Sequence, residues 1–312
     1  MMNAADQKFL KAPFPYPGGK SQAASRIWAA LGRVDCYVEP FFGSGAVLLS
    51  RPGGASGVET VNDACGLLSN FWRAVRADPR AVAEAADFPV SECDLTARHL
   101  VLVEAKAALT ARLLADPDYF DARLAGWWAW GACCWIGSGW CRGDGPWVRL
   151  QTETGPELVS ARNAGTGVNR QLPHLGDAGT GVNRKLPHLG NAGKGVNRQL
   201  PHLGDAGKGL YGWMEALAGR LRRVRITCGD FSRVLGPSVT VKHGLCGVFL
   251  DPPYAAGGHD EAMYAENDGE ASRRAREWAI ENGGNPLLRI VLAGYEGEHD
   301  MPAGWRCEAW KA

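Results

Sequence analysis

The stretch from Cys36 to Asp63 constrains the fold more than any other part of the chain. A short apolar segment, CYVEPF, runs into the glycine-rich turn FGSG and then into a helical pattern, AVLLS. After GVET the chain passes through VND, which ends on Asp63. Strand, glycine-rich turn, helix, strand and acid, in that order, is the layout of a nucleotide-binding βαβ unit.

The same alternation returns near the end of the chain. A helix is predicted over 21–31, with Ser21 placed to cap it. Four further segments predict strands: VRITCGDF (224–231), CGVFLDPPY (246–254), LLRIVLAGY (287–295) and WRCEAW (305–310). We therefore expect an α/β fold, a Rossmann-like sheet with helices on both faces, built from residues 1–75 and 225–312.

Residues 76–224 interrupt this pattern and are predicted to form an inserted domain of helices and loops. Residues 80–125 are Ala-rich and helical in pattern, with a break at Asp116-Pro117. Residues 126–140 hold five of the twelve tryptophans, which we interpret as buried core in preference to a base-stacking platform. Three copies of a fourteen-residue repeat follow over 167–208, and their Gly and Pro content predicts loops or short hairpins.

Charge is unevenly distributed along the chain. The formal net charge is +1, but residues 161–225 contain eleven Lys/Arg and three acids, a local +8. The remainder therefore sums to −7, and this asymmetry suggests a polyanionic partner for the middle of the chain, or else a solvated basic surface.

Composition sets further bounds. Hydrophobic residues make up 46% and charged residues 21% of the 312 residues, as in ordinary globular proteins. No run of 18 apolar residues and no signal-peptide core occurs, so we expect a cytoplasmic protein without a membrane span. The nine cysteines include no C-x-x-C pair, which predicts reduced, mostly buried thiols and no metal site.

Two local features carry chemistry. The glycine turn contains only G-x-G, Gly43 and Gly45, so a dinucleotide site is disfavoured, although glycine allows a ligand close to the backbone. Asp63 stands where an acid would accept hydrogen bonds from ribose hydroxyls, or where it would cap a helix. At the end of VFL, the residues Asp251 to Tyr254 provide a carboxylate, two rigid prolines and an aromatic ring.

Four motifs occur in a characteristic order: PFPYPGGK (13–20), YVEPFFGSGAV (37–47), VNDACGLLSNFWRAV (61–75) and FLDPPY (249–254). With them, the chain resembles the Dam-like N6-adenine-specific DNA methyltransferases over about half of its length. The resemblance implies S-adenosylmethionine as cofactor, double-stranded DNA as partner, base flipping, and a bacterial or phage-infected cell. It leaves open whether the protein acts alone or beside a restriction enzyme in restriction-modification, and it makes residues 76–224 the target-recognition domain.

The resemblance also implies site residues. Tyr16 and Lys20 would hold the methionine end of the cofactor, with Gly19 a further cofactor contact, and Asp63 would bind its ribose. The remaining expected cofactor contacts are Glu39, Phe41, Gly43, Gly45, Asp230 and Phe231. The expected catalytic residues are Asp251, Pro252, Pro253 and Tyr254.

The chemistry of adenine methylation explains why Asp-Pro-Pro-Tyr follows a strand. The N6 amine is a poor nucleophile because its lone pair is delocalised into the ring. Asp251 and the Pro252 carbonyl can accept the two amine hydrogens and free that lone pair, and orientation supplies much of the acceleration. Tyr254 offers a stacking face worth about 1–3 kcal/mol, against a flipping cost of a few kcal/mol.

Other functions remain open at this point. An N4-cytosine methyltransferase needs the same geometry, although Asp at position 251 disfavours it. A cytosine-C5 enzyme would need a Pro-Cys pair, which the chain lacks. A methyltransferase for RNA or protein would share the pocket, but the basic insertion favours duplex nucleic acid. A DNA-binding protein without catalysis is the alternative from another class.

The repeat supplies candidate DNA contacts. Each GVNR copy places an Asn before an Arg, and these side chains can meet phosphates or base edges. The candidates are Asn169, Arg170, Asn183, Arg184, Asn197 and Arg198. The competing hypothesis is a slipped duplication that forms a surface loop.

Overall fold

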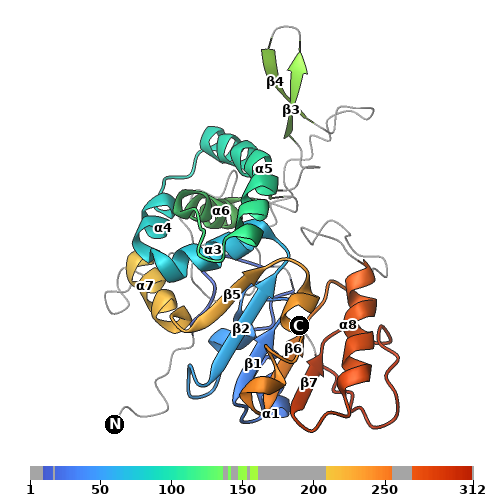
Figure 1. The fold of residues 1–312 in the computed structure, drawn as a ribbon. Coiled ribbons are helices and arrows are strands. Elements are labelled where there is room, and N and C mark those ends of the chain that lie inside the picture. Colours follow the sequence, from blue (N-terminus) through green and yellow to red (C-terminus); the bar gives the residue numbers. More distant parts are fainter. Residues whose placement is uncertain are drawn as a thin grey trace, which may run out of the picture.

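A five-stranded parallel sheet forms the centre of the molecule (Figure 1). The computed structural model describes residues 10–16, 18–135, 140–141, 147–152, 155–160, 209–254 and 269–310. The strand order is β5-β2-β1-β6-β7 and every neighbouring pair is parallel. The strands are β1 (Cys36–Glu39), β2 (Val58–Asp63), β5 (Val224–Cys228), β6 (Cys246–Leu250) and β7 (Leu288–Leu292). The predicted α/β class is confirmed.

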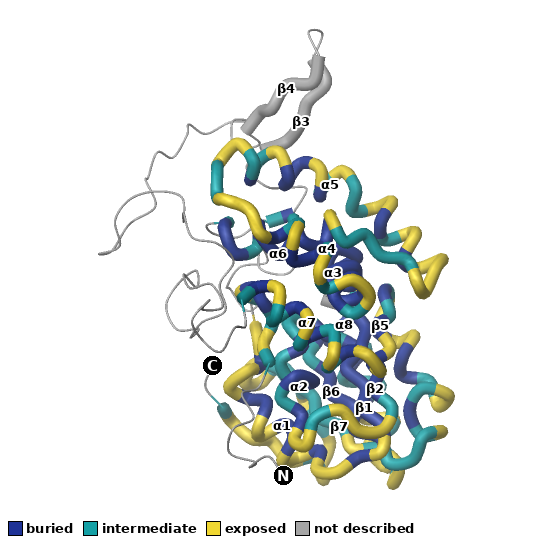
Figure 2. Tube along the Cα trace, turned by 90° about the vertical axis from the view of Figure 1, so that its left-hand side faces the viewer, coloured by how far each residue is buried: buried dark blue, intermediate teal, exposed yellow. Residues whose placement is uncertain are grey.

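Alternate strand residues face two separate apolar cores, as the period of two requires. Tyr37 and Phe249 belong to the larger core, and their sequence neighbours Val38 and Val248 belong to the smaller one. The larger core is covered by α1 (Ala24–Leu31), α2 (Ala46–Leu49), α3 (Gly66–Ala77) and α7 (Leu210–Leu221). The smaller core is covered by η2 (Phe231–Val234) and α8 (Gly269–Asn282). Helices therefore lie on both faces, and the central strands are buried (Figure 2).

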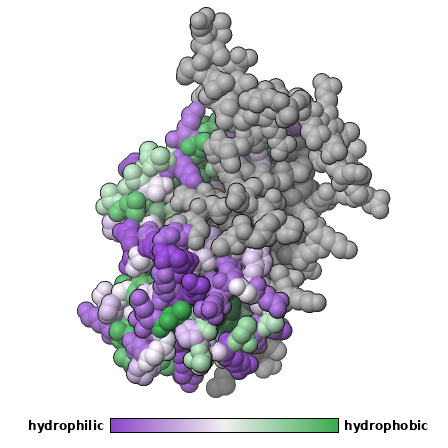
Figure 3. Space-filling model, turned by 90° about the vertical axis from the view of Figure 1, so that its right-hand side faces the viewer, coloured by the Kyte–Doolittle hydropathy of each residue, from purple (hydrophilic) through white to green (hydrophobic). Residues whose placement is uncertain are grey.

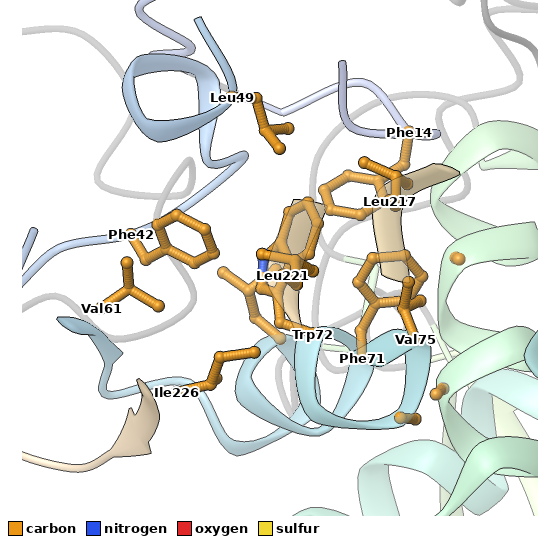
Figure 4. Close-up of a cluster of buried hydrophobic side chains, with 14 of the residues drawn as sticks. Phe14, Phe42, Leu49, Val61, Phe71, Trp72, Val75, Leu217, Leu221 and Ile226 are labelled. Atoms are coloured by element: carbon orange, nitrogen blue, oxygen red, sulfur yellow. The ribbon is translucent and has the colours of Figure 1, made fainter. Parts of the chain in front are cut away.

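An aromatic cluster anchors α3 to the glycine turn (Figure 4). Phe14 packs edge-on against Phe71, with ring centroids 5.1 Å apart, and Phe42 lies 5.1 Å from Trp72. The indole Nε1 of Trp72 donates a hydrogen bond to the Gly43 carbonyl at 3.0 Å. Core packing therefore fixes the backbone of the turn that follows β1.

Between α3 and α7 the structure describes three helices and a hairpin, within the range predicted as an insertion. They are α4 (Pro79–Ala86), α5 (Glu92–Ala115), α6 (Ala122–Cys134), and a hairpin of β3 (Trp147–Thr152) and β4 (Gly155–Ser160). Helix α5 ends at the predicted break, and Trp128 and Trp130 of α6 are buried as predicted. The hairpin was not predicted. The repeat over 167–208 lies outside the described residues.

Two local predictions were wrong. Helix α1 begins after Ala23, without a side-chain cap, because Lys20 and Ala23 close a backbone turn that precedes the helix. Residues 305–310 form no strand. Trp305 packs on the smaller core instead, and the Ala309 carbonyl accepts a hydrogen bond from Arg26 at 3.1 Å. Side-chain contacts, rather than a ladder beside β7, hold this segment.

The cysteines agree with the sequence analysis. Of the nine cysteines, all free, only Cys93 and Cys307 are exposed, which confirms the prediction of mostly buried thiols.

Across the described ranges, no helix is long and apolar enough to cross a membrane. The face that carries α8 is mixed in character, with hydrophilic residues predominating (Figure 3). A short 3-10 helix, η3 (Val241–His243), precedes β6.

A buried ion triad joins the end of the predicted insertion to the sheet. Glu59 of β2 accepts from Arg51 at 2.8 Å and from Arg220 of α7 at 2.6 Å, and all three side chains are less than a tenth exposed. Arg51 also donates to the Val34 carbonyl, and Arg220 to the Leu48 carbonyl. Helix α7 is thus fastened to the sheet by charge as well as by apolar packing.

Replacing Glu59 by Gln should destabilise the protein by about 3–5 kcal/mol, because two buried arginines lose their counter-charge. Denaturant unfolding measures this change. Glu84→Gln is the matched control: its exposed pair with Arg80 should contribute no more than about 1 kcal/mol. Equal stability changes in the two variants would show that the triad is not a structural link.

Candidate active site at the carboxyl edge of the sheet

A cavity of about 400 Å³ opens at the carboxyl ends of β1, β2, β5 and β6. Ligands of open parallel sheets bind outside this edge, where the loops after the strands converge. The volume lies within the usual range for small-molecule sites. The edge is therefore the candidate active site.

Four carboxylates line this cavity, and each lies at the carboxyl end of a different strand or just after it. They are Glu39, Asp63, Asp230 and Asp251. Parallel strands bring their carboxyl ends to one edge, so residues distant in sequence meet there. Asn62 braces the arrangement: its amide donates to the carbonyls of Pro40 at 3.1 Å and Gly229 at 2.8 Å. It thereby ties the ends of β1 and β5 to β2.

The glycine turn depends on a left-handed residue at Gly43, which has a φ of +49°. A Cβ there would lie 2.8 Å from the ring of Tyr16, so the turn and the ring are in close contact. Gly43 and Tyr16 both border the cavity, whereas Gly45 is not among the lining residues. Gly45 instead occupies the N-cap of α2 in a left-handed conformation.

Asp63 orders two segments at once. One carboxylate oxygen accepts the Gly43 N–H at 2.9 Å, and the other accepts the Cys65 N–H at 2.9 Å. Cys65 is the N-cap residue of α3, so Asp63 also organises the start of that helix. Both interpretations of Asp63 therefore have a structural basis, because it borders the cavity as well.

An aromatic wall and an ion pair close one side of the cavity. The rings of Phe41 and Phe231 stack with centroids 4.9 Å apart, and the Arg274 guanidinium lies 4.8 Å from the Phe231 centroid. Arg274 also makes a bidentate contact with Asp230, at 2.9 and 3.0 Å. This pairing with Arg274 lowers the pKa of Asp230 to about 2.

Lys20 lies against Asp251. Its Nζ is 2.8 Å from Asp251 Oδ2 and donates to the Gly18 carbonyl at 2.7 Å. Tyr254 donates its hydroxyl hydrogen to the other oxygen of Asp251 at 3.0 Å. Burial raises the pKa of Asp251, and the charge of Lys20 acts in the opposite direction.

Glu39 is the most enclosed of the four carboxylates. It is buried, and it accepts a hydrogen bond from the Tyr37 hydroxyl at 2.9 Å. Burial holds the pKa of Glu39 well above its ordinary value. The wall beside it includes Gly19, whose N–H donates to the Tyr16 carbonyl at 3.3 Å.

The prolines and the tyrosine of Asp-Pro-Pro-Tyr differ in position. Pro252 and Pro253 line the cavity, whereas Tyr254 is not among the lining residues. Its ring lies 4.5 Å from that of Tyr295, which is 59% exposed just beyond β7. The two rings form an aromatic pair beside the cavity.

Sequence reasoning did not identify Arg274, Tyr295 or Thr110 as site residues. Arg274 and Tyr295 belong to no motif that signals contact with Asp230 or Tyr254. Thr110 lies on α5, within the predicted insertion, yet it lines the cavity beside Ala64 and Cys65. A helix of that segment therefore contributes to the same wall as β2.

One predicted feature cannot be placed. The repeat residues proposed for DNA contact, Asn169, Arg170, Asn183, Arg184, Asn197 and Arg198, lie outside the described residues. In the part of the chain that the structure describes, no group of three His, Cys, Asp or Glu side chains is arranged to hold a metal ion.

Comparison with known proteins finds a family match for part of this site. Residues 16–93 match the family model described as D12 class N6 adenine-specific DNA methyltransferase. This stretch of the 312-residue chain is therefore similar to the adenine-specific DNA methyltransferases of that family. The match spans Tyr16, Lys20, the glycine turn and Asp63, and it confirms the resemblance seen in the motifs. Among curated proteins, none matches the chain.

Replacing Arg274 by Gln should raise the pKa of Asp230 from about 2 toward its ordinary 3.8, because the main cause of the lowering is removed. Carbon-13 NMR titration of the carboxyl group measures the shift. Arg273→Gln is the control, since Arg273 pairs with Glu270 and Glu277 instead. An unchanged pKa of Asp230 in Arg274→Gln would show that the ion pair with Arg274 does not set the acidity of this carboxyl group.

Proposed function

We propose that the protein transfers a methyl group from S-adenosylmethionine to the N6 amine of a flipped-out adenine in a specific sequence of double-stranded DNA. The observation that carries the proposal is the position of Asp251, Pro252 and Pro253 on the wall of the strand-edge cavity. An amine placed there would meet hydrogen-bond acceptors beside the space for the cofactor.

The cavity residues fit S-adenosylmethionine. Its acidic wall suits a ligand with a sulfonium and an ammonium group, and Phe41 and Phe231 offer apolar faces for a purine. We assign Asp63 to the ribose, and Tyr16, Gly19 and Glu39 to the methionine end. When bound, the cofactor supplies an electrophilic methyl group.

The chain's own residues would activate the amine. Asp251 and the Pro252 carbonyl accept its two hydrogens, and the fixed φ of proline keeps that carbonyl in one direction. One amine proton must leave as N6 gains the methyl group. Asp251 can accept it, since burial raises the pKa of that carboxyl group. Correct placement of the two acceptors is the main catalytic contribution of this loop.

The second part of the proposal concerns recognition of the DNA. A base in a duplex must be flipped out to reach the cavity. The ring of Tyr254, supported by Tyr295, is available to stack on it. Contacts from the repeat arginines to phosphates, and the target-recognition role of residues 76–224, rest on the sequence alone.

Transfer of labelled methyl from S-adenosylmethionine to duplex DNA tests the function. Nucleoside analysis of the product should give N6-methyladenine. N4-methylcytosine as the labelled nucleoside would establish the alternative target, and absence of transfer to any duplex would favour a DNA-binding protein without catalysis.

Replacing Asp251 by Asn should lower the rate of methyl transfer at least about 10²-fold, because the neutral amide is a weaker acceptor than the carboxylate and cannot take up the amine proton. Single-turnover kinetics with saturating cofactor measures the loss. Asp300→Asn, which alters an exposed acid of the same type, should keep the wild-type rate. Retention of more than a tenth of the rate by Asp251→Asn contradicts this role.

Replacing Gly43 by Ala should weaken S-adenosylmethionine binding by roughly 10-fold, because strain of about 1–3 kcal/mol and the displaced Tyr16 ring both alter the cavity wall. Gly53→Ala is the matched control: Gly53 also has a positive φ, of +77°, but a Cβ there meets nothing within 4 Å. Calorimetry compares the two variants. Similar affinities of the two variants for S-adenosylmethionine would show that Gly43 is not part of the cofactor site.

A further inference from the structure

We propose that Lys20 is a positioning residue for Asp251, which it keeps ionised and oriented, rather than a residue that holds the cofactor. The proposal rests on the proposed function, because it assigns a role within the same methyl-transfer site. It differs from the role that the family resemblance implies for Lys20, at the methionine end of the cofactor.

The contacts of Lys20 are directed at the Asp-Pro-Pro-Tyr loop. Its Nζ lies 2.8 Å from Asp251 Oδ2, and the side chains are 5% and 17% exposed. The same ammonium donates to the Gly18 carbonyl at 2.7 Å. An ammonium has three donors, so these two partners occupy most of its capacity.

Backbone hydrogen bonds on both sides of Lys20 hold it in a turn. Lys20 follows a turn in which the Gly19 N–H donates to the Tyr16 carbonyl, and its own carbonyl accepts the Ala23 N–H at the start of α1. Lys20 therefore lies on a hydrogen-bonded turn, and its ammonium can act as a fixed counter-charge for Asp251.

Tyr254 completes a three-residue network. Its hydroxyl donates to Asp251 Oδ1 at 3.0 Å, so each carboxylate oxygen has one partner. The Lys20 ammonium also lies 5.0 Å from the centroid of the Tyr254 ring, within the range of a cation–π attraction. Lys20 thus contacts both the carboxylate that would accept the amine hydrogen and the ring that would stack on the base.

The electrostatic surroundings explain why a cation is needed here. Four groups face Asp251. They are Lys20 from the turn before α1, Glu39 from β1, Glu298 from the segment after β7, and Tyr254 from the same loop as Asp251. Burial and the charge of Glu298 raise the pKa of Asp251, and Lys20 lowers it. Of the described groups named here, only Lys20 is a cation.

A neutral Asp251 would be a weaker acceptor for the amine hydrogen. Without Lys20, the pKa of Asp251 rises, so the ionised fraction at neutral pH falls. The active form is then recovered only at higher pH. A residue that merely held the cofactor would alter cofactor affinity without moving this pH dependence, and that difference makes the two roles separable.

The test compares Lys20→Met, which removes the charge, with Lys20→Arg, which keeps it. With saturating cofactor and DNA, kcat of Lys20→Met at pH 7 should fall roughly 10- to 100-fold. The acidic limb of its pH profile should move up by about one pH unit or more, and Lys20→Arg should keep the wild-type limb. The cofactor Kd of Lys20→Met, measured by calorimetry, should stay within about two-fold of wild type because the lost contacts are made to Asp251.

An unshifted acidic limb in Lys20→Met overturns the proposal, whether or not cofactor affinity changes. If Lys20→Met does not fold, Lys20→Gln replaces it, because its amide can still donate to Gly18 without a charge. Carbon-13 NMR titration of the Asp251 carboxyl group provides a readout that needs no activity. Its pKa should rise in the uncharged variant, and an unchanged value overturns the proposal even if wild-type protein methylates no DNA.

Discussion

The convergence of four carboxylates on one cavity at the sheet edge is the constraint around which the site is organised. Like charges that share a cavity disfavour each other's ionisation. Each carboxylate has a different partner: Arg274 for Asp230, Lys20 for Asp251, two backbone N–H groups for Asp63, and the Tyr37 hydroxyl for Glu39. The pKa of Asp230 is lowered while that of Glu39 is raised, so the edge carries groups of contrasting acidity.

The scaffold holds these partners in place through the two cores. Trp72 of α3 bonds the Gly43 carbonyl, so packing in the larger core fixes the turn whose N–H Asp63 accepts. On the other face, α8 packs through small alanines, which brings Arg274 to Asp230. Thr110 of α5 adds a wall from the predicted insertion. Elements from across the chain therefore meet at one cavity.

The sequence predicted the parts of this site that local patterns encode. The end of β6 before Asp251 is visible because a buried apolar run stops at a polar residue, and the end of β2 at Asp63 is visible because it completes the order strand, glycine-rich turn, helix and strand. The partners are not visible, because Arg274 reaches Asp230 across 44 positions and only the packing of α8 sets that contact. The same limit explains why WRCEAW was assigned to a strand: its apolar alternation fits one, but Trp305 packs across the smaller core.

Hydrogen–deuterium exchange with and without S-adenosylmethionine, in the absence of DNA, tests most directly whether the carboxylate edge is the cofactor site. Bound ligand should slow amide exchange after β1 (residues 40–46), at the end of β2 (62–65) and after β5 (229–231), because these segments line the cavity. Saturating cofactor that leaves exchange in all three segments unchanged would contradict the account.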